Sequence, residues 1–238
     1  MGAVYRKEFR SSMRGVAAPL FIAIVFGVVN VFFWLNNFRS DGYGSAHIEY
    51  ALISAVFWSL LFVPLLTMRL FSEERHNKTD QLLYSLPITG TQVVLGKYFA
   101  ACTVFAIPCA AFCFYPLLLE VLTDAEIPYL MCYVGIGTYF LAGCAVIAIG
   151  MFMSTLFESQ IISALTSLAV IIGLYILGNV TSSLTGFWGA VAGAVSIFSR
   201  IYNIGYGYPD WTCALYYLSA AALFVFFTVQ SFERRRWS

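Results

Sequence analysis

The sequence predicts an all-α integral membrane protein in which six transmembrane helices form one domain. The chain has 238 residues, of which 61% are hydrophobic and 11% are charged, whereas a soluble domain carries about 25% charged residues. Six apolar runs reach the roughly 20 residues that a helix needs to cross a bilayer. Basic residues concentrate in alternate connections between these runs. The net charge of +1 gives no indication of nucleic-acid binding.

The first segment, residues 1–14, is predicted to be an amphipathic helix that lies on the membrane surface and contacts lipid. Tyr5, Phe9 and Met13 recur every four residues, and basic side chains lie between them. This spacing places the apolar residues on one face of a helix. The alternative is a basic tail that only sets the topology of the chain.

The six spans are predicted from the apolar runs that carry no charge at their centres. The fourth run is longer than a bilayer requires, so it must tilt or project beyond the hydrocarbon. A shorter run, residues 187–198, has 12 residues and predicts a re-entrant helix in the outer leaflet before the last span. The predicted spans are residues 15–35, 50–68, 98–119, 127–157, 161–180 and 211–232.

The distribution of lysine and arginine predicts the orientation, because cytoplasmic loops carry an excess of these residues. Eleven of the 13 basic residues lie in the N-terminal segment, in residues 69–97 or at the C-terminus, and the other two are Arg39 and Arg200. Both termini and residues 69–97 are therefore expected on the cytoplasmic side of the cytoplasmic membrane.

Residues 69–97 form the longest connection on the predicted cytoplasmic side. Thr79 is a suitable helix N-cap, and Pro87 ends the turn that follows. Between them, Leu82, Leu83 and Leu86 form an apolar stripe at helical spacing. These features predict a short amphipathic helix at the membrane surface.

The end of this connection, GTQVVLGK, superficially resembles a phosphate-binding loop. That loop requires four residues between its glycines and a Ser or Thr after the lysine. Here five residues separate Gly90 from Gly96, and Tyr98 follows Lys97. The nucleotide-binding interpretation is therefore rejected, and Lys97 is expected to anchor the cytoplasmic end of the third span.

The strip from residue 68 to residue 97 resembles the signature of ABC-2 type permeases, most closely the branch involved in gliding motility and copper-enzyme maturation. The six-span layout is similar along the whole chain. Two positions depart from the pattern, because Lys78 replaces a usual Gly and Gln81 replaces a usual Glu. The matching residues are Met68, Arg69, Glu73, Glu74, Arg75, Thr79, Leu82, Leu83, Pro87, Gly96 and Lys97.

The resemblance implies an ABCG-like (type V exporter) permease fold in a prokaryotic cytoplasmic membrane. It implies a separate ABC ATPase subunit that binds ATP and Mg²⁺, since this chain has no Walker motif and is not expected to be an enzyme or to bind a cofactor itself. A second permease, identical or similar, completes the transporter, and an auxiliary subunit with an extracytoplasmic domain can accompany it. The implied ATPase-coupling residues are Glu73, Glu74, Arg75, Thr79, Leu82, Leu83, Leu86 and Pro87.

The expected function is that of a permease subunit, which couples ATP hydrolysis by its partner to export of a substrate. One alternative is a scaffold that transmits ATPase force to an extracytoplasmic partner without transport. Another is a secondary carrier, which is disfavoured because no ionisable residue lies at the centre of a span. By analogy with ABCG-like folds, the candidate translocation path comprises Phe57, Trp58, Thr166, Val170 and Asn179, for which ordinary helix packing is the alternative.

Cys102, Cys109 and Cys113 share one face of the third span. Thiolates can bind Cu(I), but no CxxC pair and no intramembrane histidine accompany them. Packing as small hydrophobic residues is the favoured interpretation, and no metal site is predicted.

Overall fold

The computed structural model describes residues 1–37, 48–76, 89–122, 127–180, 193, 196–201 and 211–236. Every element in these ranges is a helix, which confirms the predicted all-α class. Within the described ranges, five helices are long and apolar enough to cross a membrane, or six if one bent pair counts as a single span. The longer helices are α1 (Gly2–Arg14), α2 (Ala17–Asn37), α3 (Ile48–Leu60), α7 (Gly90–Phe112), α9 (Tyr129–Leu156), α10 (Gln160–Val180) and α13 (Trp211–Arg236), and the shorter ones are α4 (Val63–Thr67), α5 (Arg69–His76), α8 (Tyr115–Leu122) and α12 (Ile197–Ile201).

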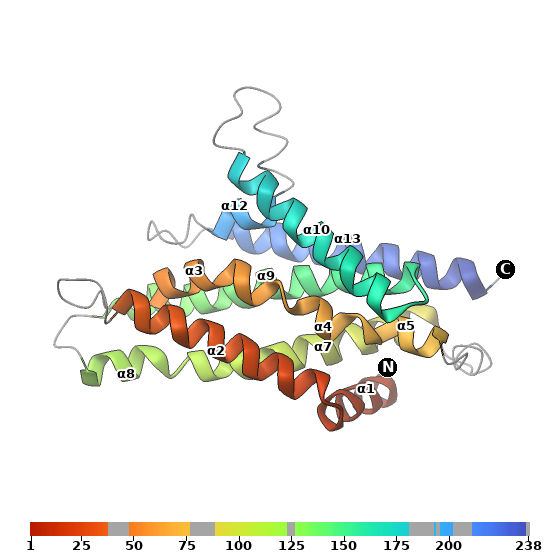
Figure 1. Ribbon diagram of the computed structural model, residues 1–238, viewed down its shortest axis with the longest axis horizontal. Helices are drawn as coiled ribbons and strands as arrows, with labels where there is room; N and C mark the ends of the chain where they lie inside the picture. Colours follow the sequence, from red (N-terminus) through yellow and green to blue (C-terminus); the bar gives the residue numbers. More distant parts are fainter. Residues whose placement is uncertain are drawn as a thin grey trace.

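Helix α9 lies at the centre of the bundle, between α2, α7 and α8 on one side and α10, α12 and α13 on the other (Figure 1). About two-thirds of its most apolar stretch is buried within the chain itself. Two glycines allow close approach of its neighbours. A Cβ atom on Gly143 would lie 2.0 Å from the Phe105 ring of α7, and one on Gly150 would lie 2.4 Å from the Thr67 hydroxyl of α4.

The second predicted span, residues 50–68, is not one straight helix. Helix α3 ends at Leu60, α4 begins at Val63, and the helix axis bends by 47° between them. Pro64 lies in the first turn of α4. Its ring would clash with the Leu60 carbonyl in a continuous helix, and it has no N–H to donate, so the chain turns at this point.

The third predicted span, residues 98–119, is longer than expected and is also interrupted. Helix α7 begins at Gly90, directly after the N-cap residue Thr89, and α8 follows a turn at residues 113–114. Helix α7 ends at Phe112, and Pro116 follows four residues later. The same spacing separates Pro64 from Leu60, the last residue of α3. A proline alone does not determine where a helix breaks, since Pro108 lies within α7.

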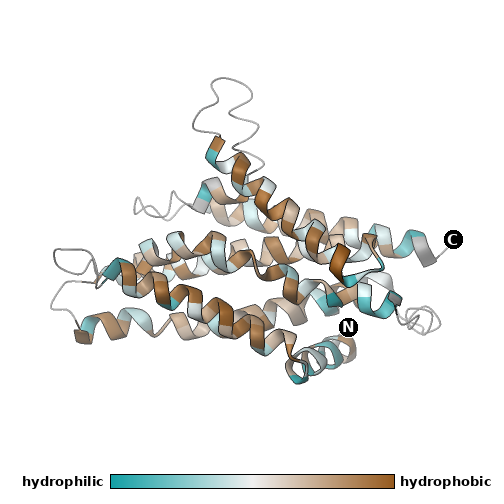
Figure 2. Cartoon of the chain, in the orientation of Figure 1, coloured by the Kyte–Doolittle hydropathy of each residue, from teal (hydrophilic) through white to brown (hydrophobic). Residues whose placement is uncertain are grey.

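Both termini and α5 lie at one end of the bundle (Figure 1). Hydrophilic residues gather there on α1, around α5 and at the end of α13 (Figure 2). We call this region the charged end. It corresponds to the side that the lysine and arginine distribution predicts to be cytoplasmic.

Helix α1 packs across α7 at the charged end. The sequence predicts that its apolar stripe contacts lipid, but Phe9 and Met13 contact the protein core and the Tyr5 hydroxyl lies 3.1 Å from that of Thr103. Gly96 explains this approach, because a Cβ atom there would lie 3.1 Å from Val4. The apolar stripe therefore stabilises the tertiary fold.

Helix α10 leans away from the bundle toward its C-terminal end (Figure 1), and only 17% of its most apolar stretch is buried. The predicted re-entrant segment, 187–198, lies largely outside the described residues. Helix α12, which overlaps its end, packs against α10 and α13. Ser196 donates to the Leu174 carbonyl, and Tyr217 donates to the Ile197 carbonyl over 2.9 Å.

Candidate functional site

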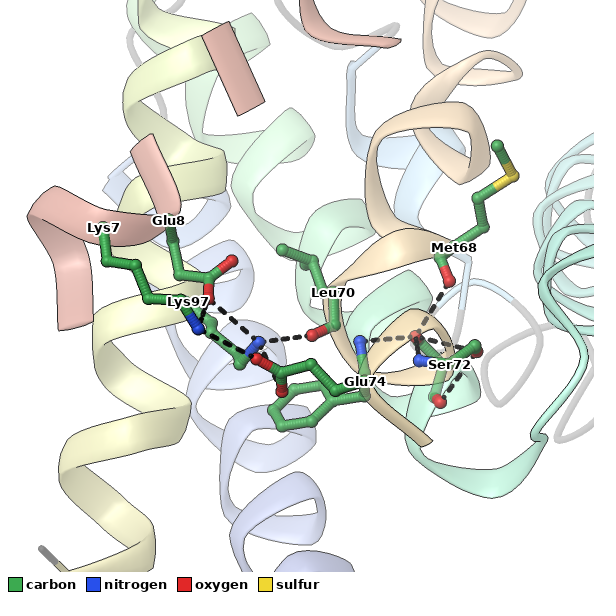
Figure 3. A network of polar contacts seen from close by, with 9 residues as sticks. Lys7, Glu8, Met68, Leu70, Ser72, Glu74 and Lys97 are labelled. Atoms are coloured by element: carbon green, nitrogen blue, oxygen red, sulfur yellow. Dashed lines mark hydrogen bonds and ion pairs between the residues drawn. The ribbon is translucent and has the colours of Figure 1, made fainter. Parts of the chain in front are cut away.

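The candidate site at the charged end is built around α5, and α9 supplies the cap of that helix. The first N–H groups of a helix have no partner within it. Here the backbone N–H groups of Phe71 and Ser72 donate to the Ser154 hydroxyl oxygen of α9 over 3.1 and 3.2 Å. Ser154 in turn donates to the Met68 carbonyl (Figure 3). This cap comes from a residue far away in sequence, so it ties α5 to the centre of the bundle.

Replacing Ser154 by Ala is expected to destabilise α5 by about 1–2 kcal/mol, the usual cost of losing an N-cap oxygen. Amide hydrogen exchange at residues 70–75 should then accelerate by roughly tenfold. Thr138→Ala is the matched control on the same helix, because that hydroxyl donates to the Val134 carbonyl one turn earlier in α9 itself. Unchanged exchange in α5 would show that the Ser154 cap contributes little.

Arg75 joins the other end of α5 to the end of α9. Its guanidinium donates to the Thr155 carbonyl over 2.8 Å and to the Glu158 carboxylate over 3.1 Å. Carbonyls in the last turn of a helix lack internal partners, and a cation there also interacts favourably with the helix dipole. Arg75 thus stabilises the C-terminus of α9, and its side chain is mostly buried.

Lys97 is the central charge of the site and is 1% exposed. Its ammonium lies 2.9 Å from a Glu74 carboxylate oxygen and 3.3 Å from one of Glu8, and it donates to the Leu70 carbonyl (Figure 3). It also lies 5.0 Å from the centre of the Phe71 ring. A buried ammonium is tolerated only when it is paired and hydrogen-bonded. The expected surface anchor is therefore a buried junction of α1, α5 and α7, which we call the Lys97 junction.

Lys7 closes the junction from its exposed side. Its ammonium lies 3.5 Å from Glu74 and 3.6 Å from Glu8, but its side chain is 66% exposed. Solvent screens such a pair, so its contribution to stability is small. Of these two lysines, the buried Lys97 therefore compensates the two carboxylates more effectively.

The predicted coupling residues separate into two groups. Glu74 and Arg75 make the contacts described above, and Glu73 lines a neighbouring pocket. The remaining predicted coupling residues, Thr79, Leu82, Leu83, Leu86 and Pro87, lie outside the described residues. Glu74 and Lys97 nevertheless flank that segment, and their contact brings its two ends together.

The predicted path residues lie on α3 and α10, and only some of them come together. The Phe57 ring stacks on Tyr175 of α10 with centroids 3.8 Å apart. Trp58 and Asn179 are exposed, Val170 packs against the core, and the Thr166 hydroxyl donates to carbonyls of its own helix. The structure thus places α3 beside α10 through aromatic contacts.

Two of the three cysteines lie in α7, and Cys113 directly follows its last residue. Cys102 and Cys109 are buried, and Cys113 is partly buried with its thiol directed to the Cys109 carbonyl. Among the described residues, no group of three or more His, Cys, Asp or Glu side chains could hold a metal ion.

Glu8 and Ser154 belong to the site, although no motif in the sequence predicts a role for either residue. Glu8 is the only acidic residue in the N-terminal segment, which otherwise carries only basic charges. Such an isolated acid among bases is a signal for a specific partner. Ser154 gives no comparable signal, because serine is common in membrane helices and its role depends on α5.

Comparison with known families gives one match that covers most of the chain. The model of the family described as ABC-2 family transporter protein matches residues 36–232. No curated protein matches the chain.

Proposed function

Because the chain belongs to the ABC-2 transporter family, whose members are membrane components of ABC transporters, we propose that it couples a separate ATPase subunit to the export of a substrate. In this proposal the segment between α5 and α7 receives the ATPase. The Lys97 junction then carries the movement of that segment to the membrane helices.

The observation that supports this function best is the contact between Glu74 and Lys97. Glu74 lies in the last turn of α5, which ends at His76, and Lys97 lies about two turns into α7. Their 2.9 Å contact, shared with Glu8 of α1, fixes the two flanks relative to each other. When the ATPase pushes on the segment between α5 and α7, the two ends of that segment should therefore move together and not apart.

The same region leads directly into the centre of the bundle. Ser154 and the Thr155 carbonyl connect α5 to α9, and α9 packs against α10 and α13. Interiors are close-packed and transmit displacement. A movement of α5 thus reaches α10, the least buried of the apolar helices, which leans away from the rest of the chain.

The first test concerns docking of the ATPase. Leu83→Asp is expected to reduce the amount of ATPase that co-purifies with the full chain at least about tenfold, because an apolar docking contact cannot accommodate an unpaired carboxylate. Leu122→Asp, at the opposite end of the bundle on an exposed side chain, is the matched control. Normal recovery of the ATPase with Leu83→Asp would contradict docking at this segment.

The second test concerns transmission and uses Glu74→Gln in the assembled complex. The ATPase should still bind, whereas the ATP-dependent change in hydrogen exchange of α9 and α10 should be largely lost. Glu120→Gln, at the opposite end, should leave that change intact. A complex that binds ATPase and changes α9 and α10 normally with Glu74→Gln would show that movement does not pass through the junction. Retained movement in wild type without passage of any substrate would favour the scaffold alternative.

A further inference from the structure

A pocket of about 190 Å³ lies beside the Lys97 junction, where α1, the start of α2 and the α4–α5 turn meet. It is smaller than the roughly 300–1,000 Å³ of sites for drug-sized ligands. Its size suits a small polar group rather than a whole transported molecule. The lining residues are Glu8, Ser11, Ser12, Gly15, Ala17, Ala18, Leu66, Arg69, Leu70 and Glu73.

The pocket lies beside the start of a candidate membrane span, where lipid headgroups are expected. Helix α1 ends at Arg14, and α2, a candidate membrane span, begins at Ala17. Apolar Ala17, Ala18 and Leu66 line one part of the pocket, and charged and hydroxyl side chains line the rest. This combination of an apolar and an ionic part in one small cavity matches the boundary between acyl chain and headgroup.

The polar groups of the pocket carry both signs of charge and retain unused bonding capacity. Arg69 and Glu73 are one turn apart on α5, yet neither makes an ion pair with any described residue. Glu8 contacts Lys7 and Lys97 through Oε1 only, which leaves its Oε2 available. The Ser11 and Ser12 hydroxyls likewise donate to no other described residue. A ligand with one cationic and one anionic group would satisfy all of them.

We propose that this pocket binds the headgroup of phosphatidylethanolamine from the leaflet at the charged end. The primary ammonium would lie between Glu8 and Glu73 and donate hydrogen bonds to their free oxygens. The phosphate would accept from the Arg69 guanidinium, whose planar donors suit phosphate oxygens, and from Ser11 and Ser12. The acyl chains would leave along the apolar side formed by α2 and α4.

This chemistry discriminates among common headgroups. The trimethylammonium of phosphatidylcholine has no N–H to donate, so it would leave the carboxylates without hydrogen bonds and would require more space. Phosphatidylglycerol carries a neutral glycerol in place of the ammonium, so it would bring no positive charge to Glu8 and Glu73. Each missing charged hydrogen bond should weaken binding by about tenfold.

The test is a titration of the purified full chain with phosphatidylethanolamine, phosphatidylcholine and phosphatidylglycerol of identical acyl chains, followed by native mass spectrometry. Phosphatidylethanolamine should bind about tenfold more tightly than the other two. Glu73→Gln should remove that preference, and Arg69→Gln should weaken binding of all three lipids. Glu120→Gln and Arg234→Gln are matched controls outside the pocket and should bind as wild type does.

Two outcomes would overturn the proposal. One is equal affinity for the three lipids in the wild-type chain, or a preference that survives both Glu73→Gln and Arg69→Gln. The other is competition by soluble glycerophosphoethanolamine at the same concentration as the lipid, which would identify a soluble ligand as the occupant. Both outcomes are independent of the proposed ATPase coupling, because no ATPase is present in the titration.

Discussion

Replacing Lys97 by Met is expected to lower the free energy of unfolding by about 2–4 kcal/mol. Methionine retains most of the side-chain volume, so the change removes the charge with little loss of packing. Glu74 and Glu8 then lose the buried ammonium that both contact, and the exposed Lys7 also lies within 3.6 Å of both carboxylates. Removal of one member of a buried ion pair costs about 3–5 kcal/mol because the remaining charge is uncompensated. The range is lower here because both carboxylates retain some contact with solvent.

Thermal unfolding of the purified chain in detergent, followed by circular dichroism, measures this effect. Lys7→Met is the matched control, since it removes a lysine from the same pair of carboxylates at an exposed position and should cost at most about 1 kcal/mol. Adding Glu74→Gln to Lys97→Met should recover part of the loss, because it removes one of the two carboxylates that lost the Lys97 ammonium. Equal effects of Lys97→Met and Lys7→Met would refute the buried junction.

Replacing Gly143 by Ala is expected to disrupt the contact between α7 and α9. The new methyl group would lie 2.0 Å from one carbon of the Phe105 ring and 2.4 Å from another. That ring is fully buried and packs against Phe21 and Tyr139, so it has little room to move. Overpacking of this kind costs about 3 kcal/mol, while the gain in helix propensity returns about 1 kcal/mol. The expected net loss is about 2 kcal/mol.

Gly137→Ala on the same helix provides a close control. No atom lies within 4 Å of a Cβ placed there, so only the propensity gain remains and the stability should be unchanged or slightly higher. Combining Gly143→Ala with Phe105→Leu should recover part of the loss, because the smaller side chain leaves space for the methyl group. If Gly143→Ala and Gly137→Ala gave the same unfolding temperature, the close packing of α7 on α9 would be disproved.

Several features could be predicted from local sequence because they depend on hydrophobicity and chain geometry alone. A run such as residues 161–180 has no charge and the length of a bilayer, and it forms α10 from Gln160 to Val180. The prolines at 64 and 116 also carry local information, but they were not used to predict the breaks at Leu60 and Phe112. Their effect could not be separated from that of Pro108, which α7 accommodates.

The charged residues could not be placed from the sequence, because burial of a charge depends on partners from other elements. Lys97 appeared to be an anchor at the end of a span, as most lysines at such positions are. It is buried instead, since Glu8 from α1 and Glu74 from α5 both reach it. The same holds for Ser154, whose hydroxyl becomes a helix cap only when α5 lies against α9.

The sequence by itself determined the helical membrane class, the approximate positions of the spans and the resemblance to ABC-2 permeases, because these depend on composition and on residues close together in the chain. Only the tertiary structure decided which charges of the strip from residue 68 to residue 97 point inward. Glu74 and Lys97 meet because α5 and α7 pack together while α1 crosses Gly96. When segments that are distant in sequence pack around a charged side chain, they remove water from it. The loss of water decides whether that charge remains a surface contact or becomes the centre of a junction.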